Sequence, residues 1–281
     1  MESGPSVALL PAFTKSAAFD FIVPIKTYLE KKKCLIFSDE SVADRFHLPK
    51  ITDSTRIDVF ITLGGDGTLC FYKQKYRHFK KVPFTAVNLG GLGFMADVKI
   101  EDLESYLDDL IAGKFLVEER LMLEASHRGK HSVAINDVVI HRGSNPSMIA
   151  LKVHINDSYF NTFLADGIII ASPTGSSAYS LASGGPLMHP TLSAIVITPI
   201  AAHTLTNRPF VIADTSKIEI EYISSFEPVF ATLDGLHQLP LQSGELISIT
   251  RSQDTFDLIS YPHRQDYFST LRTKLHWKGS A

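Results

Sequence analysis

Residues 59–68 read Val-Phe-Ile-Thr-Leu-Gly-Gly-Asp-Gly-Thr, and this stretch indicates the fold and the chemistry more clearly than any other part of the chain. Its apolar and β-branched half is typical of a strand buried on both faces. Glycines, which have no Cβ, then let the backbone turn sharply and approach a ligand closely, and successive N–H groups in such a loop suit a phosphate. Asp66 is itself a poor phosphate ligand because like charges repel, so we expect it to accept a proton or to help hold a metal. The stretch therefore indicates phosphoryl chemistry at the end of a buried strand.

The first third of the chain alternates strand-like and helix-like segments. Strands are expected at 7–10, 34–37, 57–63 and 82–88, and helices at 17–32 and 68–79. Pro24 should kink or delay the first helix. This alternation predicts a parallel sheet that binds ligands at the carboxyl ends of its strands. The second helix directs the positive end of its dipole toward the glycine loop, which favours an anion there.

After about residue 97 the pattern changes to short segments separated by polar or glycine-containing turns. An amphipathic helix at 100–112 is followed by strands expected at 122–126, 132–141, 147–155, 159–164, 167–171, 194–198, 217–223, 229–233 and 246–251. Short strands at this spacing predict an all-β second domain. A helix at 266–277 is expected to return to the first domain. We therefore predict an α/β domain of residues 1–97 plus about 262–281 and a β-rich domain of residues 98–261, since 281 residues is near the upper limit for one core.

Composition narrows the class of protein. Hydrophobic residues at 44% and charged residues at 20% are ordinary for a soluble globular protein, and a net charge of −3 without a basic run argues against a nucleic-acid partner. The apolar stretch 194–202 is too short to span a bilayer and residues 1–11 do not resemble a signal peptide, so we expect a cytoplasmic protein with no membrane partner. Cys34 and Cys70 are expected to be buried and reduced. The eleven histidines form no set with ligand spacing, so no metal ligand is assigned.

A second glycine segment, 90–93, follows the strand expected at 82–88. Residues 91–96 formally match a dinucleotide-binding fingerprint, but that fingerprint should open a helix that leads to another strand of the same sheet. Here the next helix leads into the β-rich region. We therefore expect a second glycine loop facing the same cleft as Asp66, rather than a Rossmann dehydrogenase.

Residues 166–180 form the other dense motif, in which a strand runs into a turn of serine, threonine and glycine and then opens a helix. Small residues allow a ligand to approach closely, hydroxyls donate and accept adaptably, and Tyr179 offers a flat face with a polar tip. Such a surface suits a nucleoside. From this pattern alone, an ordinary capped turn remains the alternative.

Together these motifs resemble the NAD kinase family. Residues 64–68 are shared by NAD kinases, by diacylglycerol and sphingosine kinases and, more loosely, by phosphofructokinases, whereas 166–190 resembles a block that lipid kinases lack. Residues 88–95, 198–209 and 267–275 resemble further blocks of the family, the last of them found in bacterial members. The match runs in order from about residue 7 to the end, and the chain is similar to the compact bacterial NAD kinases.

The resemblance implies a reaction and its partners. The γ-phosphate of ATP would be transferred to the 2′-hydroxyl of the adenosine ribose of NAD to give NADP, with Mg²⁺ or another divalent cation, by a homodimer or homotetramer. A Rossmann-like α/β domain would be followed by a β-sandwich-like domain. Asp66 would be the general base for the ribose hydroxyl, whose poor nucleophilicity a nearby carboxylate improves. Gly65, Gly67 and Thr68 would shape the phosphate path.

The resemblance also implies contacts with NAD. Asn136 and Asp137 match a family Asn-Glu pair that lies against the dinucleotide, and Asp166 would contact one end of NAD. The other expected contacts are Thr174, Ser177, Ala178, Tyr179, Ser180, Leu181 and Ala182. Aspartate at 137 shortens the reach of the usual Glu by one methylene, and Leu236 stands where a Gln often follows Asp-Gly in the family.

Three alternatives are compatible with the sequence. A lipid or other small-alcohol kinase could share the glycine loop, although residues 166–190 argue against it. A non-catalytic NAD-binding sensor could keep the pocket, although an intact Asp66 argues against that. Asp66 could also simply cap the following helix, as aspartate often does.

Overall fold

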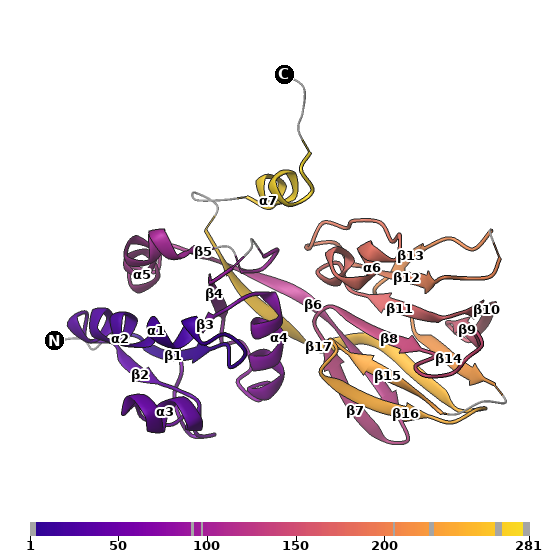
Figure 1. The fold of residues 1–281 in the computed structure, drawn as a ribbon, viewed down its shortest axis with the longest axis horizontal. Coiled ribbons are helices and arrows are strands. Elements are labelled where there is room, and N and C mark those ends of the chain that lie inside the picture. The colour runs from indigo at the N-terminus through magenta and orange to yellow at the C-terminus, as the bar shows by residue number, and fades with distance from the viewer. Residues whose placement is uncertain are drawn as a thin grey trace. The chain divides into compact units, whose positions relative to one another are not determined.

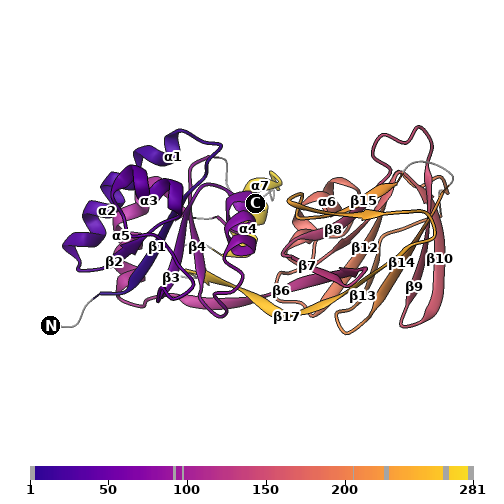
Figure 2. The ribbon, with the colours of Figure 1, turned by 90° about the horizontal axis from the view of Figure 1, so that it is seen from below.

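The computed structural model describes residues 4–90, 93–96, 98–204, 206–224, 228–261 and 266–277. It divides into two compact units, an α/β unit of Met1–Glu119 with Phe256–Ala281 and a β unit of Arg120–Thr255. Strands β6 (Leu116–His127) and β17 (Leu246–Ser260) each contribute residues to both units (Figure 2). The sequence placed the domain boundaries after residues 97 and 261, whereas the two units of the structure divide after Glu119 and after Thr255. Asp97 and residues 262–265 lie outside the described residues.

The α/β unit is built on the parallel strands β2, β1, β3 and β4, in that order (Figure 1). Their bounds are β1 (Ser6–Pro11), β2 (Leu35–Phe37), β3 (Val59–Leu63) and β4 (Phe84–Asn88), and β4 also pairs with β5 (Val98–Lys99) and with the end of β17. Every residue of β1, β3 and β4 is buried. Their continuous apolar runs are therefore explained by a strand that is covered on both faces.

The unit has helices in the segments where the sequence predicts them and one further helix, α3, which the sequence did not predict. They are α1 (Ala17–Asp20), α2 (Ile22–Lys31), α3 (Glu40–Phe46), α4 (Asp66–Lys75), η1 (Ile100–Asp102), α5 (Leu103–Ile111) and α7 (Tyr267–Lys274). The helix expected at 17–32 is divided at Phe21, and Pro24 lies in the first turn of α2, where its missing N–H breaks no helical hydrogen bond. Tyr106, Leu107 and Leu110 of α5 are buried in the same apolar core as β1 and β3. Helix α5 therefore belongs to the α/β unit.

The strand order of the α/β unit reverses between β1 and β3. Along the chain, β1 is followed by β2 on one side, and the chain then crosses back to β3 on the other side. In open parallel sheets, ligands bind outside the carboxyl ends of the strands at such a reversal. The N–H of Ala12, just after β1, donates to Leu63 O at 2.9 Å, and the N–H of Gly64 donates to Val87 O at 2.9 Å. The glycine loop after β3 is thereby held at the reversal.

The β unit packs two antiparallel sheets over one core (Figure 1). One sheet has the order β13-β12-β11-β8-β15-β16, with bounds β8 (Asp137–His141), β11 (Gly167–Ala171), β12 (Ala194–Ile200), β13 (Phe210–Ala213), β15 (Val229–Leu233) and β16 (His237–Leu241). The other sheet has the order β10-β9-β14-β17, with bounds β10 (Ser158–Ala165), β9 (Ile149–Ile155) and β14 (Ile218–Ile223). Strand β6 pairs with β17 and with β7 (Lys130–Ala134). The expected strand at 132–141 is two strands, β7 and β8. Strands β13 and β16, which the sequence did not predict, are the exposed edges of their sheet.

Cys34 and Cys70 are both buried and free, as expected. Lys274 of α7 lies over the ring of Phe94 at 4.2 Å from its centroid, so the last helix contacts the α/β unit as predicted. Over the described part of the chain, the helices are too short or too polar to span a membrane.

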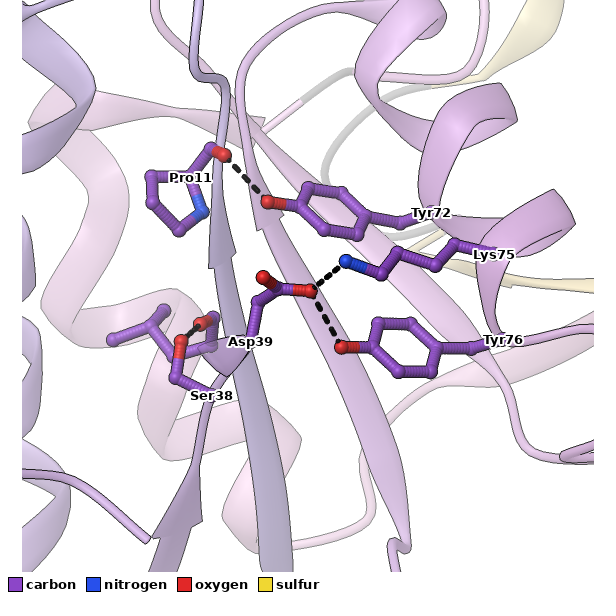
Figure 3. Close-up of polar contacts among 7 residues, drawn as sticks. Pro11, Ser38, Asp39, Tyr72, Lys75 and Tyr76 are labelled. Atoms are coloured by element: carbon purple, nitrogen blue, oxygen red, sulfur yellow. Dashed lines mark hydrogen bonds and ion pairs between the residues drawn. The ribbon is translucent and has the colours of Figure 1, made fainter. Parts of the chain in front are cut away.

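A polar cluster fixes helix α4 against the ends of β1 and β2 (Figure 3). Tyr72, Lys75 and Tyr76 lie on one face of the helix because they are three and four residues apart. The hydroxyl of Tyr72 donates to Pro11 O at 2.8 Å, and the hydroxyl of Tyr76 donates to Asp39 Oδ2 at 2.8 Å, where Lys75 Nζ also bonds. Asp39 is only 4% exposed. The helix that begins at Asp66 is therefore anchored through its later turns.

Asp39→Asn should destabilise the α/β unit by about 1–3 kcal/mol, because a buried hydrogen-bonded charge is lost. Burial alone would raise the pKa of Asp39, but the hydrogen bonds from Lys75 and Tyr76 and the charge of Lys75 lower it. A lowered pKa stabilises the fold above the unfolded value near ~3.9 and ceases to do so as pH falls below it. Urea unfolding at pH 7 measures the effect. Asp44→Asn, which removes an exposed partner of Lys50, is the control. It should change the free energy of unfolding by less than about 0.5 kcal/mol. Equal losses of stability in the two variants would contradict the anchoring role of Asp39.

Candidate functional site

The carboxylate of Asp66 is held by three consecutive backbone N–H groups. Phe94 N donates to Oδ2 at 2.8 Å, while Met95 N at 3.1 Å and Ala96 N at 2.8 Å donate to Oδ1. A carboxylate offers about four lone-pair sites. The three bonds therefore orient the group and leave capacity for one further donor, and Asp66 is only partly buried. This geometry suits a carboxylate that accepts a proton from a ligand.

Asp66 does not cap helix α4, so the capping alternative is wrong. The N-cap residue is Gly65, and no side chain caps this end of the helix. The reason is geometric, because the carboxylate turns away from its own helix toward residues 94–96, about thirty positions along the chain. Gly65 and Gly67 have no neighbour within 4 Å of an added Cβ, which leaves open space beside the loop.

Gly93 is the residue that lets this segment close around Asp66. A β-carbon on Gly93 would overlap Oδ1 of Asp66 and lie 2.9 Å from Ala96 O. The side-chain amide of Asn88, at the end of β4, donates to the same Ala96 O at 3.0 Å. The second glycine loop thus contacts the first, as the sequence predicts, while its residues Gly91 and Leu92 lie outside the described part.

The β unit carries a pocket of about 470 Å³ over one face of the sheet that contains β8 and β15. Its lining residues are Asn136, Asp137, Val139, His141, Ala178, Tyr179, Thr232, Asp234 and Gly235. Four of the residues expected to contact NAD are among them, namely Asn136, Asp137, Ala178 and Tyr179. Tyr179 is 42% exposed and supplies a flat face with a polar tip. The structure thus brings together residues that lie about forty positions apart in the sequence.

The turn at residues 135–137 is held from two sides. Asp234 accepts the N–H groups of Ile135 at 2.8 Å, Asn136 at 2.7 Å and Asp137 at 3.2 Å. On the other side, the N–H of Ser172 donates to Asn136 O at 2.8 Å. Backbone hydrogen bonds on both sides therefore fix the position of Asn136 in the pocket wall.

Asp137 sits in an unusual electrostatic environment. Burial, together with the neighbouring charge of Asp234, raises its pKa to about 7. Both effects disfavour the charged carboxylate. At neutral pH, the carboxyl group of Asp137 is therefore protonated in some molecules and ionised in others. Groups in pockets whose pKa is strongly shifted are candidates for a functional site.

The remaining expected residues lie outside the pocket lining. Asp166 forms an ion pair with Arg142, Nε to Oδ1 at 2.7 Å. The Oγ1 of Thr174 is buried and has no hydrogen-bond partner among the described residues, whereas Ser177 Oγ donates to Thr174 O at 3.0 Å. Ser180 is fully buried and shares a hydrogen bond with Thr198 at 2.8 Å, which favours a structural role. Leu181 and Ala182 continue the short helix α6 (Tyr179–Ala182).

Sequence reasoning missed Gly93 as the closing residue, Asp234 as the organiser of the pocket, and His141 and Thr232 as lining residues. Asp234 has a positive φ of 50° and precedes Gly235. The Asp-Gly pair was therefore a visible turn signal, but its hydrogen bonds join residues almost one hundred positions apart.

The described residues do not form a resident metal cage. Within them, no three His, Cys, Asp or Glu side chains lie close enough to hold a metal ion. Asp66 and Asp234 each already accept three N–H groups. Their remaining acceptor capacity does not fit a site for Mg²⁺ made by the protein alone, and Mg²⁺ in general binds through substrate phosphates with few protein ligands.

Gly93→Ala should lower kcat at least tenfold while the protein stays folded, because the added methyl displaces the backbone that orients Asp66. Turnover and the thermal unfolding midpoint are to be measured together. Ser54→Ala, in an exposed turn outside both glycine loops, is the control and should leave turnover and the unfolding midpoint unchanged. A Gly93→Ala enzyme with normal turnover would show that the segment does not position the carboxylate.

Asp137→Asn should make the stability of the protein less dependent on pH. Because the pKa of Asp137 is raised to about 7, the folded state keeps a proton that the unfolded chain releases near ~4, so stability falls as pH rises through this interval. Relative to the variant, the wild type should lose about 2–4 kcal/mol between pH 4 and pH 8. Chemical unfolding at several pH values checks this, with the exposed Asp157→Asn as control; parallel curves for wild type and Asp137→Asn would contradict the raised pKa.

Comparisons with known proteins agree with this arrangement. A family model for the ATP-NAD kinase N-terminal domain matches residues 28–115, and one for the ATP-NAD kinase C-terminal domain matches residues 135–261. The NAD kinase of Protochlamydia amoebophila is 39% identical over 276 residues, which cover 97% of this chain and 98% of the relative. That of Trichlorobacter lovleyi is 40% identical over 261 residues, 89% of this chain and 91% of the relative.

Solved structures share the fold. A crystal structure of yeast NADH kinase complexed with NADH superimposes with a TM-score of 0.88 at 24% identity and covers 100% of this chain and 90% of its own. An NAD kinase from Archaeoglobus fulgidus in complex with ATP gives a TM-score of 0.78 at 20% identity, with coverage of 98% and 100%. The solved structures agree in fold, and the matched domains and the relatives show that the chain belongs to the NAD kinase family.

Proposed function

We propose that the protein phosphorylates the 2′-hydroxyl of the adenosine ribose of NAD to give NADP, with ATP as donor and Asp66 as general base. The observation that carries the proposal is the Asp66 carboxylate, held by three N–H groups and with capacity for one more hydrogen bond. Membership of the NAD kinase family supports the reaction, and ATP is the donor that the family uses. Neither a lipid kinase nor a dehydrogenase is favoured by the comparisons.

The reaction needs a base for the ribose hydroxyl and a site that positions the transferred phosphate. Asp66 accepts the proton of the ribose hydroxyl. The hydroxyl oxygen then forms a bond to the γ-phosphorus of ATP. The bond between this phosphorus and the oxygen that bridges it to the β-phosphorus breaks, and ADP leaves. Phosphoryl transfer otherwise depends on positioning and on neutralising charge. Gly65 and Gly67 have open space beside them, and with Thr68 they form the proposed path of the transferred group. A divalent cation bound to the donor, as in MgATP, would neutralise charge on the transferred phosphate, since Mg²⁺ in general binds through substrate phosphates with few protein ligands.

The pocket of the β unit is the proposed binding surface for NAD. Tyr179 provides an aromatic face, and Asn136 and Asp137 provide polar groups on a turn that is already ordered. Thr174, Ser177 and Asp166 stay proposed contacts on the strength of the family resemblance. The buried hydroxyl of Thr174, which no described residue satisfies, supports a role for that residue.

Two further expectations accompany the proposal. A homodimer or homotetramer stays a prediction, and it is supported by the exposed edge strand β13, where Phe210 and Val211 are each 45% exposed. A cytoplasmic location likewise stays a prediction from the sequence.

Asp66→Asn should lower kcat by about 10²- to 10⁴-fold with little change in the KM for NAD, because a general base contributes that much to proton transfer. A coupled assay of NADP formation from NAD, ATP and Mg²⁺ measures both proteins in parallel. Turnover in the variant within tenfold of wild type would remove Asp66 from the mechanism. If the wild-type protein bound NAD tightly but formed no NADP, the result would favour the alternative of a non-catalytic NAD-binding sensor.

A further inference from the structure

The pocket of the β unit extends past the residues that the family resemblance assigns, as far as His141. Asp137, Val139 and His141 alternate along β8 and therefore lie on one face of its sheet. Four steps along a strand span about 13 Å, so contacts at Asp137 and at His141 reach different parts of one nucleoside. The end of the pocket at His141 has no role in the reaction as described above.

The ring of His141 offers the pocket a hydrogen-bond donor. Its Nδ1 accepts the N–H of Gly143 at 3.1 Å, because a φ of 59° at Gly143 turns the backbone back toward the ring. A backbone N–H only donates, and in a neutral imidazole one nitrogen accepts while the other carries the proton. The proton of His141 therefore lies on Nε2. No described residue accepts a hydrogen bond from this N–H, so it is available to a ligand.

The residues in register with His141 on the two neighbouring strands are an aromatic residue and a glycine. On β15 the residue is Phe230, which is 47% exposed, whereas Val229 and Ala231 beside it are buried in the core. Directly opposite residues of antiparallel strands have Cβ atoms about 4.5–5.5 Å apart. On β11 the residue is Gly167, which places no side chain beside the imidazole. An exposed aromatic ring and a ring N–H donor therefore lie next to each other at this end of the pocket.

The two ends of the pocket suit different parts of a nucleoside. At one end Asp137 and Asp234 provide carboxyl groups, which as acceptors suit the hydroxyl groups of a sugar. The end at His141 has the opposite character, since it combines a donor with a flat apolar ring. A nucleobase matches both features, because it is flat and carries hydrogen-bond acceptors at its edge. Aromatic rings that stack or meet edge to face gain about 0.5–1.5 kcal/mol beyond the burial of their area.

We propose that His141 and Phe230 recognise a nucleobase of NAD, with Nε2–H of His141 donating to an acceptor at the edge of the base and Phe230 packing against its face. The inference rests on the proposed function for the identity of the ligand. Adenine, through its ring nitrogens, and nicotinamide, through its carboxamide oxygen, share the chemistry of a flat heteroaromatic ring with an acceptor at its edge. The test therefore separates these two bases.

His141→Phe keeps a ring and removes both nitrogens, whereas His141→Gln keeps an N–H donor near the position of Nε2. The Kd for NAD, measured by calorimetric titration, should rise about 3- to 10-fold in His141→Phe, the range for one lost hydrogen bond, and stay within about twofold of the wild type in His141→Gln. Phe230→Leu removes the aromatic face and should raise the same Kd by about 3- to 10-fold. His131→Phe makes the same change at an exposed histidine of β7, outside the pocket, and as the matched control should leave the Kd unchanged.

Steady-state kinetics and thermal unfolding separate recognition of the base from damage to the fold. In His141→Phe the KM for NAD should rise with the Kd, while kcat and the KM for MgATP stay within about twofold of the wild type, because a contact with the base is made equally in the ground state and the transition state. The thermal unfolding midpoint of each variant shows whether the fold is intact. Phe230→Leu tests the same end of the pocket independently if His141→Phe does not fold.

Titration with ADP-ribose, which lacks nicotinamide, identifies the base. If His141→Phe weakens the binding of ADP-ribose by the same factor as that of NAD, the base at this end of the pocket is adenine. If it weakens the binding of NAD alone, the base is nicotinamide. Either result supports the inference.

Two results would overturn the inference. One is an unchanged Kd for NAD in both His141→Phe and Phe230→Leu, and the other is an equal loss of affinity in His141→Phe and His141→Gln, because the N–H donor would then be irrelevant to binding. The proposed function fails separately. If the wild type bound NAD through these residues but formed no NADP, the reaction would be refuted and the recognition of the base would stand. Normal NADP formation with unchanged Kd values in the variants would remove the recognition site only.

Discussion

The hydrogen bonds between the Asp66 carboxylate and the peptide N–H groups of residues 94–96 are the interaction on which the rest of the α/β unit depends. They join the loops that follow β3 and β4 and fix the direction in which the carboxylate points. Gly93 makes them possible, because any side chain there would occupy the space of the carboxylate. The later turns of α4, anchored to β1 and β2 through Tyr72, Lys75 and Tyr76, keep the start of that helix in place.

The β unit also contains a carboxylate that accepts hydrogen bonds from consecutive backbone N–H groups. Asp234 also accepts three consecutive N–H groups, those of residues 135–137, and thereby orders the turn that presents Asn136. Its charge, added to burial, raises the pKa of Asp137 to about 7. In the first unit the organised carboxylate is the proposed general base, whereas in the second it organises the wall of a pocket. In both arrangements, hydrogen bonds within the protein orient the carboxylate.

Much of this could be predicted from the sequence, because the signals were local. The buried strands 59–63 and 84–88 are runs of apolar and β-branched residues, and the glycines after Leu63 marked the loop that carries Asp66. Asn136, Asp137, Ala178 and Tyr179 came from the family resemblance, and the structure gathers them at one pocket. Local patterns could not reveal the roles of Gly93 and Asp234, because these act through contacts with residues far away in the chain. Strands β13 and β16 were missed for a related reason: as exposed edges they lack the buried alternation that marks an inner strand.

The central claim is that the segment closed by Gly93 acts on catalysis through Asp66. A double-mutant cycle tests it most directly, with single-turnover rates of phosphoryl transfer measured at saturating NAD and MgATP for wild type, Gly93→Ala, Asp66→Asn and the double variant. The account predicts that Gly93→Ala slows the wild-type enzyme but adds no further loss once Asp66 is asparagine. Losses that multiply independently in the double variant would contradict it, because they would show that the segment and the carboxylate contribute separately.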